Sequence, residues 1–349
     1  MDFLLYGANG YTGQLIAELA VNQGLRPLLA GRSEEKVRPL AERLSLDYVS
    51  FDLSDTDKLE ATLQKVPAVI HAAGPFSHTF SPMVEACLRT QTHYLDITGE
   101  MAVFEAIARR DAEAKAAGVM LLPGAGFDVV PTDAMAAFLA EQLPDATHLE
   151  LAFHGNAGLS HGTAKTAIEN LENGGMIRKE GVITRVPTAH RVRHIQFSDK
   201  PLSAVAIPWG DVATAWYTTQ IPNIMVYVAQ PPKAIRMMKL SRYLGPILGL
   251  GAVQNFLKRQ VEKRPAGPSE TKRAESKTIV WGEVRRGDEK RQARLTTPEG
   301  YTLTAQASLA LVRKVLNGEA KVGFQTPAGA YGYEWLLGLE GVGEFRLEH

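Results

Sequence analysis

The sequence predicts an α/β chain, in which a doubly wound, parallel Rossmann sheet is followed by a second α+β domain built on a mixed sheet. Three observations lead to this prediction. A short apolar strand runs into an array of glycines at the N-terminus, strands then alternate with helices up to residue 122, and a different pattern follows. The 349 residues also exceed what one hydrophobic core usually supports, which favours two domains.

The glycine array lies between a strand expected at residues 2–6 and a helix expected at 11–23. Gly7 permits a tight turn, Gly10 lets the backbone approach a pyrophosphate, and Gly13 lets the helix lie close to the strand. The amides of the new helix would then face the phosphates. The residues of this turn that we expect to bind a dinucleotide are Gly7, Asn9, Gly10, Tyr11, Thr12 and Gly13.

Alternation of strands and helices continues after this turn. Strands are expected at 27–30, 48–51, 68–71, 93–97 and 119–122. Helices are expected at 34–44 with Ser33 as N-cap, and at 55–66, 82–89 and 101–117. This order indicates right-handed crossovers and a ligand site at the carboxyl ends of the strands.

The second strand ends at Gly31, Arg32 and Ser33, where an NAD-preferring site usually carries an acid. The Arg32 guanidinium would fork onto a 2′-phosphate, and the Ser33 hydroxyl would donate a further hydrogen bond. We therefore predict NADP(H) as the cofactor, against the alternative of a solvated surface arginine. Positions in the sheet add further expected contacts at Asp52, Leu53, Ala72, Ala73, Gly74, Pro75 and Phe76.

A similar glycine turn occurs in short-chain and extended-type reductases, which need a Tyr-x-x-x-Lys pair to donate a proton. None of the ten tyrosines is followed by lysine four residues later. That catalytic scheme is therefore excluded, although a non-catalytic relative is not.

Several motifs resemble the saccharopine dehydrogenase-like oxidoreductases, in particular the branch that includes trans-acting enoyl reductases. They are the glycine turn, AGR at 30–32, HAAGPF at 71–76, YLDITGE at 94–100, GAGFDVVPTD at 124–133 and GFQTPA at 323–328. The resemblance implies an NADP-binding Rossmann domain, a second α+β domain and often a homodimer. We expect the dinucleotide domain at 1–128 and 310–346, a substrate and dimerisation domain at 129–309, and a tag remnant at 347–349.

Candidate chemistry in the second half needs a proton donor and a clamp for a substrate carbonyl or carboxylate. Asp128 would be a general acid if a dry interdomain cleft raised its pKa, and a turn or capping aspartate otherwise. His161 and Lys165 would hold the substrate, or would belong to an ordinary capped helix at 164–173. Asp133 would start the helix at 134–142, and Glu100 is expected at the N-terminus of the helix that follows it.

Other expected elements of the second domain are strands within 147–153, 183–197, 224–229, 277–285 and 292–296, and a helix at 304–316. Residues 265–277 read as a mobile loop. His190 and His194 would share a strand face, but no further ligands complete a metal site, so surface histidines are favoured and no metal is expected.

An apolar run at 243–253 is flanked by basic residues between 233 and 264. It is too short to span a bilayer. A dimer interface or an apolar substrate pocket is favoured, and peripheral membrane contact through 240–257 is the alternative.

Composition narrows the function further. The formal net charge is zero, which argues against nucleic acid as a partner, and the single cysteine, Cys87, fits a reducing cytoplasm. No signal peptide is evident. The sequence thus predicts an NADP(H)-dependent oxidoreductase that moves hydride to or from a carbonyl, imine or enoyl group of a small molecule. The alternatives are a non-catalytic NADP sensor and a lipid-surface enoyl reductase.

Overall fold

Two units make up the chain in the computed structural model, which describes residues 1–155, 158, 160–169, 174–244, 250–263 and 265–348. The first unit is Met1–Val130 with Tyr301–Ala330, and the second is Pro131–Gly300 with Tyr331–His349. The C-terminal segment assigned to the first unit differs from the expected residues 310–346. The chain returns to the first unit at Tyr301, and residues from Tyr331 onward belong to the second, because Gly343 N donates to Thr296 O at 2.8 Å.

A seven-stranded parallel sheet forms the first unit, in the order β15-β6-β5-β4-β1-β2-β3. Its strands are β1 (Leu4–Tyr6), β2 (Leu28–Gly31), β3 (Tyr48–Ser50), β4 (Ala68–His71), β5 (His93–Asp96), β6 (Met120–Leu122) and β15 (Gly323–Phe324). β1 and β4 are fully buried and apolar apart from His71 at the end of β4, as expected for central parallel strands. The strand order reverses between β1 and β4, and ligands bind at such a switch point. The α/β fold class is therefore confirmed.

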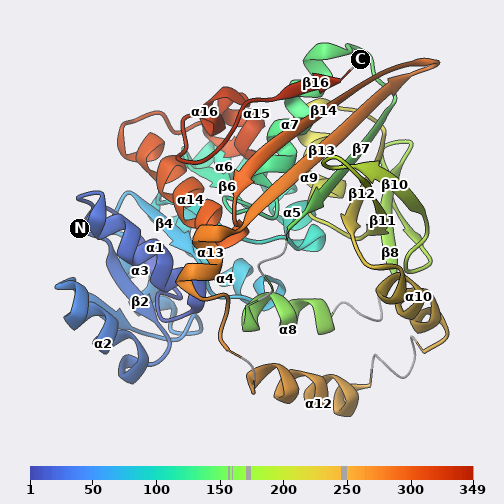
Figure 1. The fold of residues 1–349 in the computed structure, drawn as a ribbon. Helices are drawn as coiled ribbons and strands as arrows, with labels where there is room; N and C mark the ends of the chain where they lie inside the picture. Colours follow the sequence, from blue (N-terminus) through green and yellow to red (C-terminus); the bar gives the residue numbers. More distant parts are fainter. Residues whose placement is uncertain (156–157, 159, 170–173, 245–249, 264, 349) are drawn as a thin grey trace. The chain divides into compact units, whose positions relative to one another are not determined.

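Helices connect these strands (Figure 1). They are α1 (Tyr11–Asn22), α2 (Glu34–Leu44), α3 (Thr56–Leu63), α4 (Phe76–Thr90), α5 (Met101–Ala108), α6 (Asp111–Ala117), α14 (Gly300–Leu316) and α15 (Pro327–Tyr331). The helix expected at 82–89 begins six residues earlier, with Pro82 in its interior. The helix expected at 101–117 is interrupted between Ala108 and Asp111.

A nine-stranded mixed sheet forms the second unit, also as predicted. The order β10-β11-β12-β7-β13-β14-β16 contains one parallel pair, β12 with β7, and β8 pairs with β12 and β9. The strands are β7 (His148–His154), β8 (Gly175–Lys179), β9 (Val182–Val186), β10 (Val192–Gln196), β11 (Pro201–Ile207), β12 (Asn223–Ala229), β13 (Lys277–Arg286), β14 (Glu289–Pro298) and β16 (Arg346–Glu348). The long β13–β14 hairpin lies beside β7 (Figure 1).

The helical segments of this unit are α7 (Val130–Gln142), α8 (His161–Glu169), α9 (Asp211–Thr219), α10 (Pro232–Ser241), η2 (Arg242–Leu244), α12 (Gly251–Glu262), α13 (Glu270–Glu275) and α16 (Glu334–Leu337). The mobile loop expected at 265–277 is wrong in part, because α13 forms there with the Ser269 hydroxyl capping Lys272 N. Part of the helix expected at 164–173 and the centre of the apolar run, residues 245–249, lie outside the described residues. In the part of the chain that the structure describes, no helix has the length and apolarity to cross a membrane.

The two faces of the mixed sheet are covered differently. On one face α7 lies directly on β13, since a Cβ at Gly282 would stand 2.5 Å from Leu139 and 2.7 Å from Met135. On the other face, Ile195 and Phe197 pack against Trp281. Because β10 and β13 are not neighbours in the sheet, this contact means that the sheet curls and brings β10 over its own centre.

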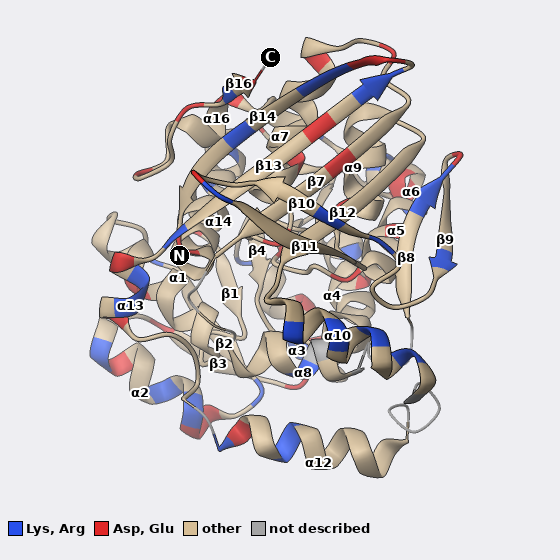
Figure 2. Ribbon diagram, turned by 45° about the vertical axis from the view of Figure 1, so that its right-hand side comes forward, with Lys and Arg blue, Asp and Glu red and all other residues tan. Residues whose placement is uncertain are grey.

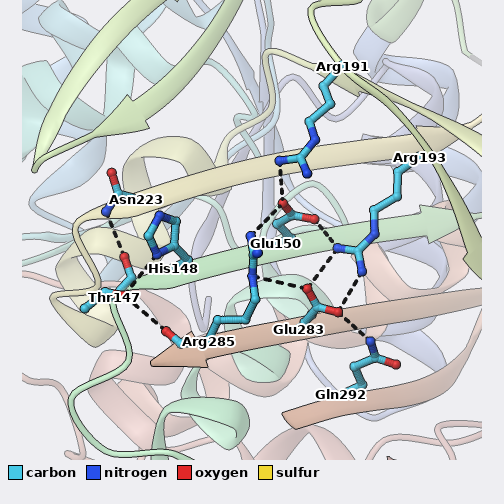
Figure 3. A network of polar contacts seen from close by, with 9 residues as sticks. All are labelled: Thr147, His148, Glu150, Arg191, Arg193, Asn223, Glu283, Arg285 and Gln292. Carbon is cyan, nitrogen blue, oxygen red and sulfur yellow. Dashed lines mark hydrogen bonds and ion pairs between the residues drawn. The ribbon is translucent and has the colours of Figure 1, made fainter. Parts of the chain in front are cut away.

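A buried ion network fastens this curl (Figure 3). Glu150 on β7 and Glu283 on β13 are 4% and 3% exposed, and Arg193 on β10 bonds to both, at 2.7 Å to Glu283. Burial alone would raise the pKa of Glu283, but hydrogen bonds from Arg193 outweigh it and hold that pKa below its usual value. The Arg193 guanidinium also lies 4.9 Å from the centre of the Trp281 ring. Arg191 and Arg285 also pair with Glu150, so three arginines surround the two carboxylates.

Candidate active site

Two of the three glycines in the first turn are required by the packing of the surrounding backbone, which leaves no room for a Cβ. Gly7 has φ +86°, and a Cβ there would stand 2.7 Å from the backbone of Ala72 and Ala73 at the end of β4. A Cβ at Gly13 would stand 2.3 Å from Gly7 O. These positions hold the turn against the switch point of the sheet, as the sequence pattern predicts.

Gly10 is different, because its Cβ position is nearly open. Within 4 Å it would meet only Gly7 O, at 3.3 Å. Gly10 is also the N-cap of α1, which carries no acid in its first turn. Open space in front of the positive end of a twelve-residue helix fits a pyrophosphate, so the residues present suit a dinucleotide.

The ends of β2 and β3 offer charged and polar groups for the adenosine half of a cofactor. Arg32 is exposed, and Ser33 is the N-cap of α2 but its side chain makes no capping bond. Hydrogen bonds from Ser54, and then the charge of Arg32, hold the pKa of Asp52 below its usual value. Of the expected pair Asp52 and Leu53, only Asp52 is exposed, since Leu53 belongs to the core.

Asn9 lies over the end of β2. A Cβ at Gly31 would stand 2.8 Å from Asn9 Oδ1 and 2.9 Å from Val37 Cγ2. The glycine at position 31 therefore leaves room for the Asn9 amide between the first turn and the second strand. Asn9 after β1 and Arg32 and Ser33 after β2, all expected to contact the cofactor, therefore lie at the same edge of the sheet.

The loop at 72–76, after β4, is fixed by a side chain from the next loop. The Glu100 carboxylate accepts hydrogen bonds from Phe76 N at 2.7 Å and Ser77 N at 3.1 Å, so it caps α4. Glu100 also lies at the N-terminus of the helix that follows it, as expected, since it is the N-cap residue of α5, although its side chain makes no capping bond there. The Thr79 hydroxyl donates to Ala73 O at 2.8 Å and holds the loop from its other side.

His71 lies under this loop and is completely buried. Because the Thr79 hydroxyl donates to Ala73 O, it accepts from His71 Nε2 at 3.0 Å, which places the ring proton on Nε2. Nδ1 is buried without a partner among the described residues. Burial lowers the pKa of His71 to about 3, so the ring is neutral at physiological pH.

Asp96, at the end of β5, organises the next two loops from inside. It is 0% exposed and accepts from the Tyr94 hydroxyl at 2.6 Å, Thr98 N at 2.9 Å and Gly124 N at 2.9 Å. Burial raises the pKa of Asp96 to about 6. Its bonds join the loops after β5 and β6, which carry Gly99 and Asp128.

Asp128 meets Gly99 at this point. A Cβ at Gly99 would stand 2.6 Å from Asp128 Oδ2, so the carboxyl group lies directly against the Gly99 backbone. Asp128 is partly exposed, and burial of its carboxyl raises its pKa to about 7. No hydrogen bond or ion pair holds this group within the described residues.

Comparison with known proteins agrees with this architecture. Residues 3–122 match the family model of the saccharopine dehydrogenase NADP binding domain. The match covers about a third of the chain. The glycine turn, the end of β2 and the 72–76 loop all lie within the matched residues.

Curated relatives include reductases. A trans-acting enoyl reductase of Mycobacterium leprae is 37% identical over 140 residues, which cover 38% of this chain and 34% of the relative. A lipid droplet localized protein of Caenorhabditis elegans is 26% identical over 80% of this chain and 77% of its own. The match to the Mycobacterium leprae reductase thus spans about a third of that protein's length. An apo saccharopine dehydrogenase (L-Glu forming) from Saccharomyces cerevisiae shares the fold over the full length of both chains, with a TM-score of 0.66 and 13% identity.

The other predicted catalytic residues belong to the second unit. Lys165 Nζ lies 2.8 Å from Glu262 Oε1, an ion pair that joins α8 to α12, and this pair lowers the pKa of Glu262. His161 donates its backbone amide to Ala266 O at 3.0 Å, and Ser160 Oγ accepts from Thr163 N at the start of α8. These contacts fit the capped-helix interpretation, and a substrate-binding role for His161 and Lys165 stays a prediction.

Asp133 is a structural residue. It is 0% exposed, lies in the first turn of α7 and accepts from the Thr218 hydroxyl at 2.5 Å, which ties α7 to α9. The interpretation that Asp133 starts the helix is wrong, because α7 begins at Val130. His194 lies on β10 but His190 precedes the strand. The described residues contain no group of three His, Cys, Asp or Glu side chains suited to a metal ion.

A cavity of about 660 Å³ lies elsewhere in the second unit. It is bounded by Phe197, Asp199, Arg294, Thr296 and Glu344, among others, and includes none of the predicted site residues.

Sequence reasoning missed the supporting residues of the site. Glu100 and Asp96 each bond to a loop that is distant in sequence, whereas His71 lies under the loop that follows it. Only the HAAGPF and YLDITGE motifs signalled that these segments matter. The residue types alone do not reveal that Glu100 caps a helix whose first residue lies 24 positions earlier.

Proposed function

We propose that the chain is an NADP(H)-dependent oxidoreductase in which Asp128 carries the proton that accompanies hydride transfer. The substrate would be a small molecule with a carbonyl, imine or enoyl group. The observation that carries the proposal is the partly exposed Asp128 carboxyl beside Gly99, with a pKa of about 7. A carboxyl group with that pKa is half protonated near neutral pH, which suits a general acid.

Residues of the first unit would hold the cofactor by distinct interactions. The N-terminus of α1 with Gly10 would bind the pyrophosphate, and Arg32 with Ser33 would bind the 2′-phosphate. The 72–76 loop, fixed by Glu100, would lie under the nicotinamide ribose. Bound NADP(H) supplies or accepts the hydride.

Asp128 would donate its proton to the substrate atom that does not receive the hydride. That atom is the oxygen of a carbonyl, the nitrogen of an imine or the carbon α to the activating group of an enoyl compound. The resulting carboxylate regains a proton from water, since Asp128 is partly exposed. In the reverse direction the carboxylate accepts the proton.

A substrate panel tests the proposal. NADPH consumption is measured with aldehyde, ketone, imine and enoyl-ester compounds, for the native chain and for Asp128→Asn. Asp57→Asn, at an exposed position of α3, is the matched control. We expect turnover with one class, lost in Asp128→Asn and retained in Asp57→Asn. Tight NADPH binding without turnover on any class would favour the non-catalytic sensor and contradict the proposal.

Homodimer formation and a cytoplasmic location stay predictions. One relative is named for lipid droplets, which supports the lipid-surface alternative. For this chain that alternative depends on helix α10, a separate observation from the cofactor site.

A further inference from the structure

Helix α10 is held firmly to the second unit. Ile235 is 5% exposed and, with Met238, packs into a cluster that includes Ala189 and Val205. The Arg242 guanidinium donates to Thr188 O at 2.5 Å and Ala189 O at 2.6 Å. These contacts fix which side of α10 faces the protein.

The opposite side of α10 and η2 is apolar as well. Met237, Leu240 and Tyr243 follow one another at intervals of three, so they share a face. Their exposed fractions are 63%, 64% and 83%. A continuous row of large apolar side chains in water on a well-anchored helix marks an interaction surface. We call these three residues the α10 outer row.

Positive charge surrounds the α10 outer row. Lys233, Arg236 and Lys239 are exposed on the same helix, and Figure 2 shows α10 with blue bands and no red ones. Between Asp211 and Glu262 the sequence contains no Asp or Glu at all. The neighbouring α12 repeats the combination, with Phe256 60% exposed next to Lys258 and Arg259.

The combination of exposed apolar side chains and basic charge distinguishes between the three roles that the sequence suggested for this segment. They are a pocket lining, a dimer interface and a membrane-binding surface. A pocket lining is disfavoured for the α10 outer row, because no part of the chain that the structure describes encloses these exposed side chains. A two-fold interface between copies of the chain would set the same basic patch against itself, where like charges repel. A membrane surface with anionic headgroups offers both an apolar layer for the row and negative charge for its flanks.

We propose that the α10 outer row and its basic flanks bind the surface of an anionic phospholipid membrane. Met237, Leu240 and Tyr243 enter the interface between headgroups and acyl chains, and Lys233, Arg236 and Lys239 pair with lipid phosphates. This surface is independent of the proposed oxidoreductase activity.

Vesicle sedimentation with the full chain tests this surface. Vesicles contain phosphatidylcholine alone, or phosphatidylcholine and phosphatidylserine in equal parts. The test variant is Leu240→Asp with Tyr243→Asp, and the matched control is Val182→Asp, since Val182 on β9 is also 64% exposed. We expect binding only to the phosphatidylserine vesicles, weakening with salt. Binding should fall about tenfold or more in the test variant and stay unchanged in the control.

Two results would overturn the inference. One is equal binding of the native chain and the test variant to the anionic vesicles, including no binding by either. The other is a native dimer, seen by light scattering, that becomes monomeric in the test variant without any vesicle binding, because the face would then belong to a second copy. NADPH affinity, measured on every variant, shows that the cofactor domain is folded.

Discussion

Asp128 lies against Gly99 so closely that a Cβ at position 99 would stand 2.6 Å from Asp128 Oδ2. The Asp128 carboxyl group can therefore occupy this position only because residue 99 has no Cβ. The two residues come from the loops after β5 and β6, which the buried Asp96 joins. The first two predictions follow from this contact.

The pH dependence of reduction should follow Asp128. With a pKa of about 7, the carboxyl is protonated below pH 7 and loses its proton above it. We expect kcat for reduction to fall about tenfold per pH unit above pH 7, and the oxidation direction to show the opposite slope. Asp128→Asn should reduce kcat by about 100- to 10,000-fold and abolish this limb of the profile. A variant that keeps the native pH profile would assign the proton to another group.

Gly99→Ala should act through Asp128. The new methyl group must displace the carboxyl, and small displacements of a catalytic group typically cost about 10- to 100-fold in rate. We expect kcat to fall by that factor while the dissociation constant for NADPH stays unchanged. In the double variant with Asp128→Asn, the alanine should add no further loss. Additive losses would show that Gly99 acts independently.

Arg32→Ala should change cofactor preference. Loss of a charge-assisted hydrogen bond to the 2′-phosphate should weaken NADPH binding by about 10- to 100-fold and leave NADH binding nearly unchanged. Fluorescence titration with both cofactors measures the ratio. Arg38→Ala on α2, an exposed arginine paired with Glu42, is the control and should change neither affinity. Tighter native binding of NADH than of NADPH would reject the role of Arg32.

His71 should make the first unit sensitive to acid. Its folded-state pKa of about 3 lies below the ordinary value of 6.5, so between these values the unfolded state binds more protons. Stability then falls as pH falls from 6.5, by roughly 3 kcal/mol between pH 6 and 4. Asp96, with its raised pKa, shifts stability in the opposite direction, so variants must be compared at each pH.

Denaturant unfolding of His71→Phe measures this effect. The native chain should lose stability on acidification relative to His71→Phe, and His78→Phe, at an exposed histidine of α4, should behave like the native chain. Parallel pH curves for His71→Phe and the native chain would contradict the prediction.

Arg193 and Arg191 should differ in their effect on stability. Arg193→Met leaves the buried Glu150 and Glu283 with Arg285, at longer distances of 3.3 and 3.4 Å, as their remaining shared partner, which should cost about 3–5 kcal/mol. Arg191 is half exposed and pairs with Glu150 alone among the described residues, so Arg191→Met should cost at most about 1 kcal/mol. The free energy of unfolding measures both. Similar costs would mean that the network does not depend on Arg193.

The sequence predicted the first unit well because its signals are local. The glycine turn, the apolar runs of β1 and β4 and the polar residues at strand ends each identify themselves within a few residues. The start of α4 could not be predicted in this way. Pro82 looks like a helix start, but the helix begins at Phe76, where its amides are capped by Glu100 from another loop.

The second unit was less predictable because its contacts are distant in sequence. Arg193 looks like a surface residue beside His194, yet β10 curls over the sheet and buries its charge between Glu150 and Glu283. Asp133 and Asp128 belong to one motif, but the first ties α7 to α9 while the second remains unpaired among the described residues. The sequence alone does not distinguish the two aspartates, because the contacts that separate them come from the fold.

The pairing of β15 with β6 affects the order in which the chain is made. β15 completes the outer edge of the first sheet, but Phe324 follows β6 by about 200 residues, most of which build the second unit. At about 5–20 residues per second, a ribosome needs roughly 10–40 s to cover that interval. During synthesis, β6 therefore presents unpaired backbone groups at a sheet edge for tens of seconds, and this edge is where a nascent chain would first meet a chaperone or aggregate.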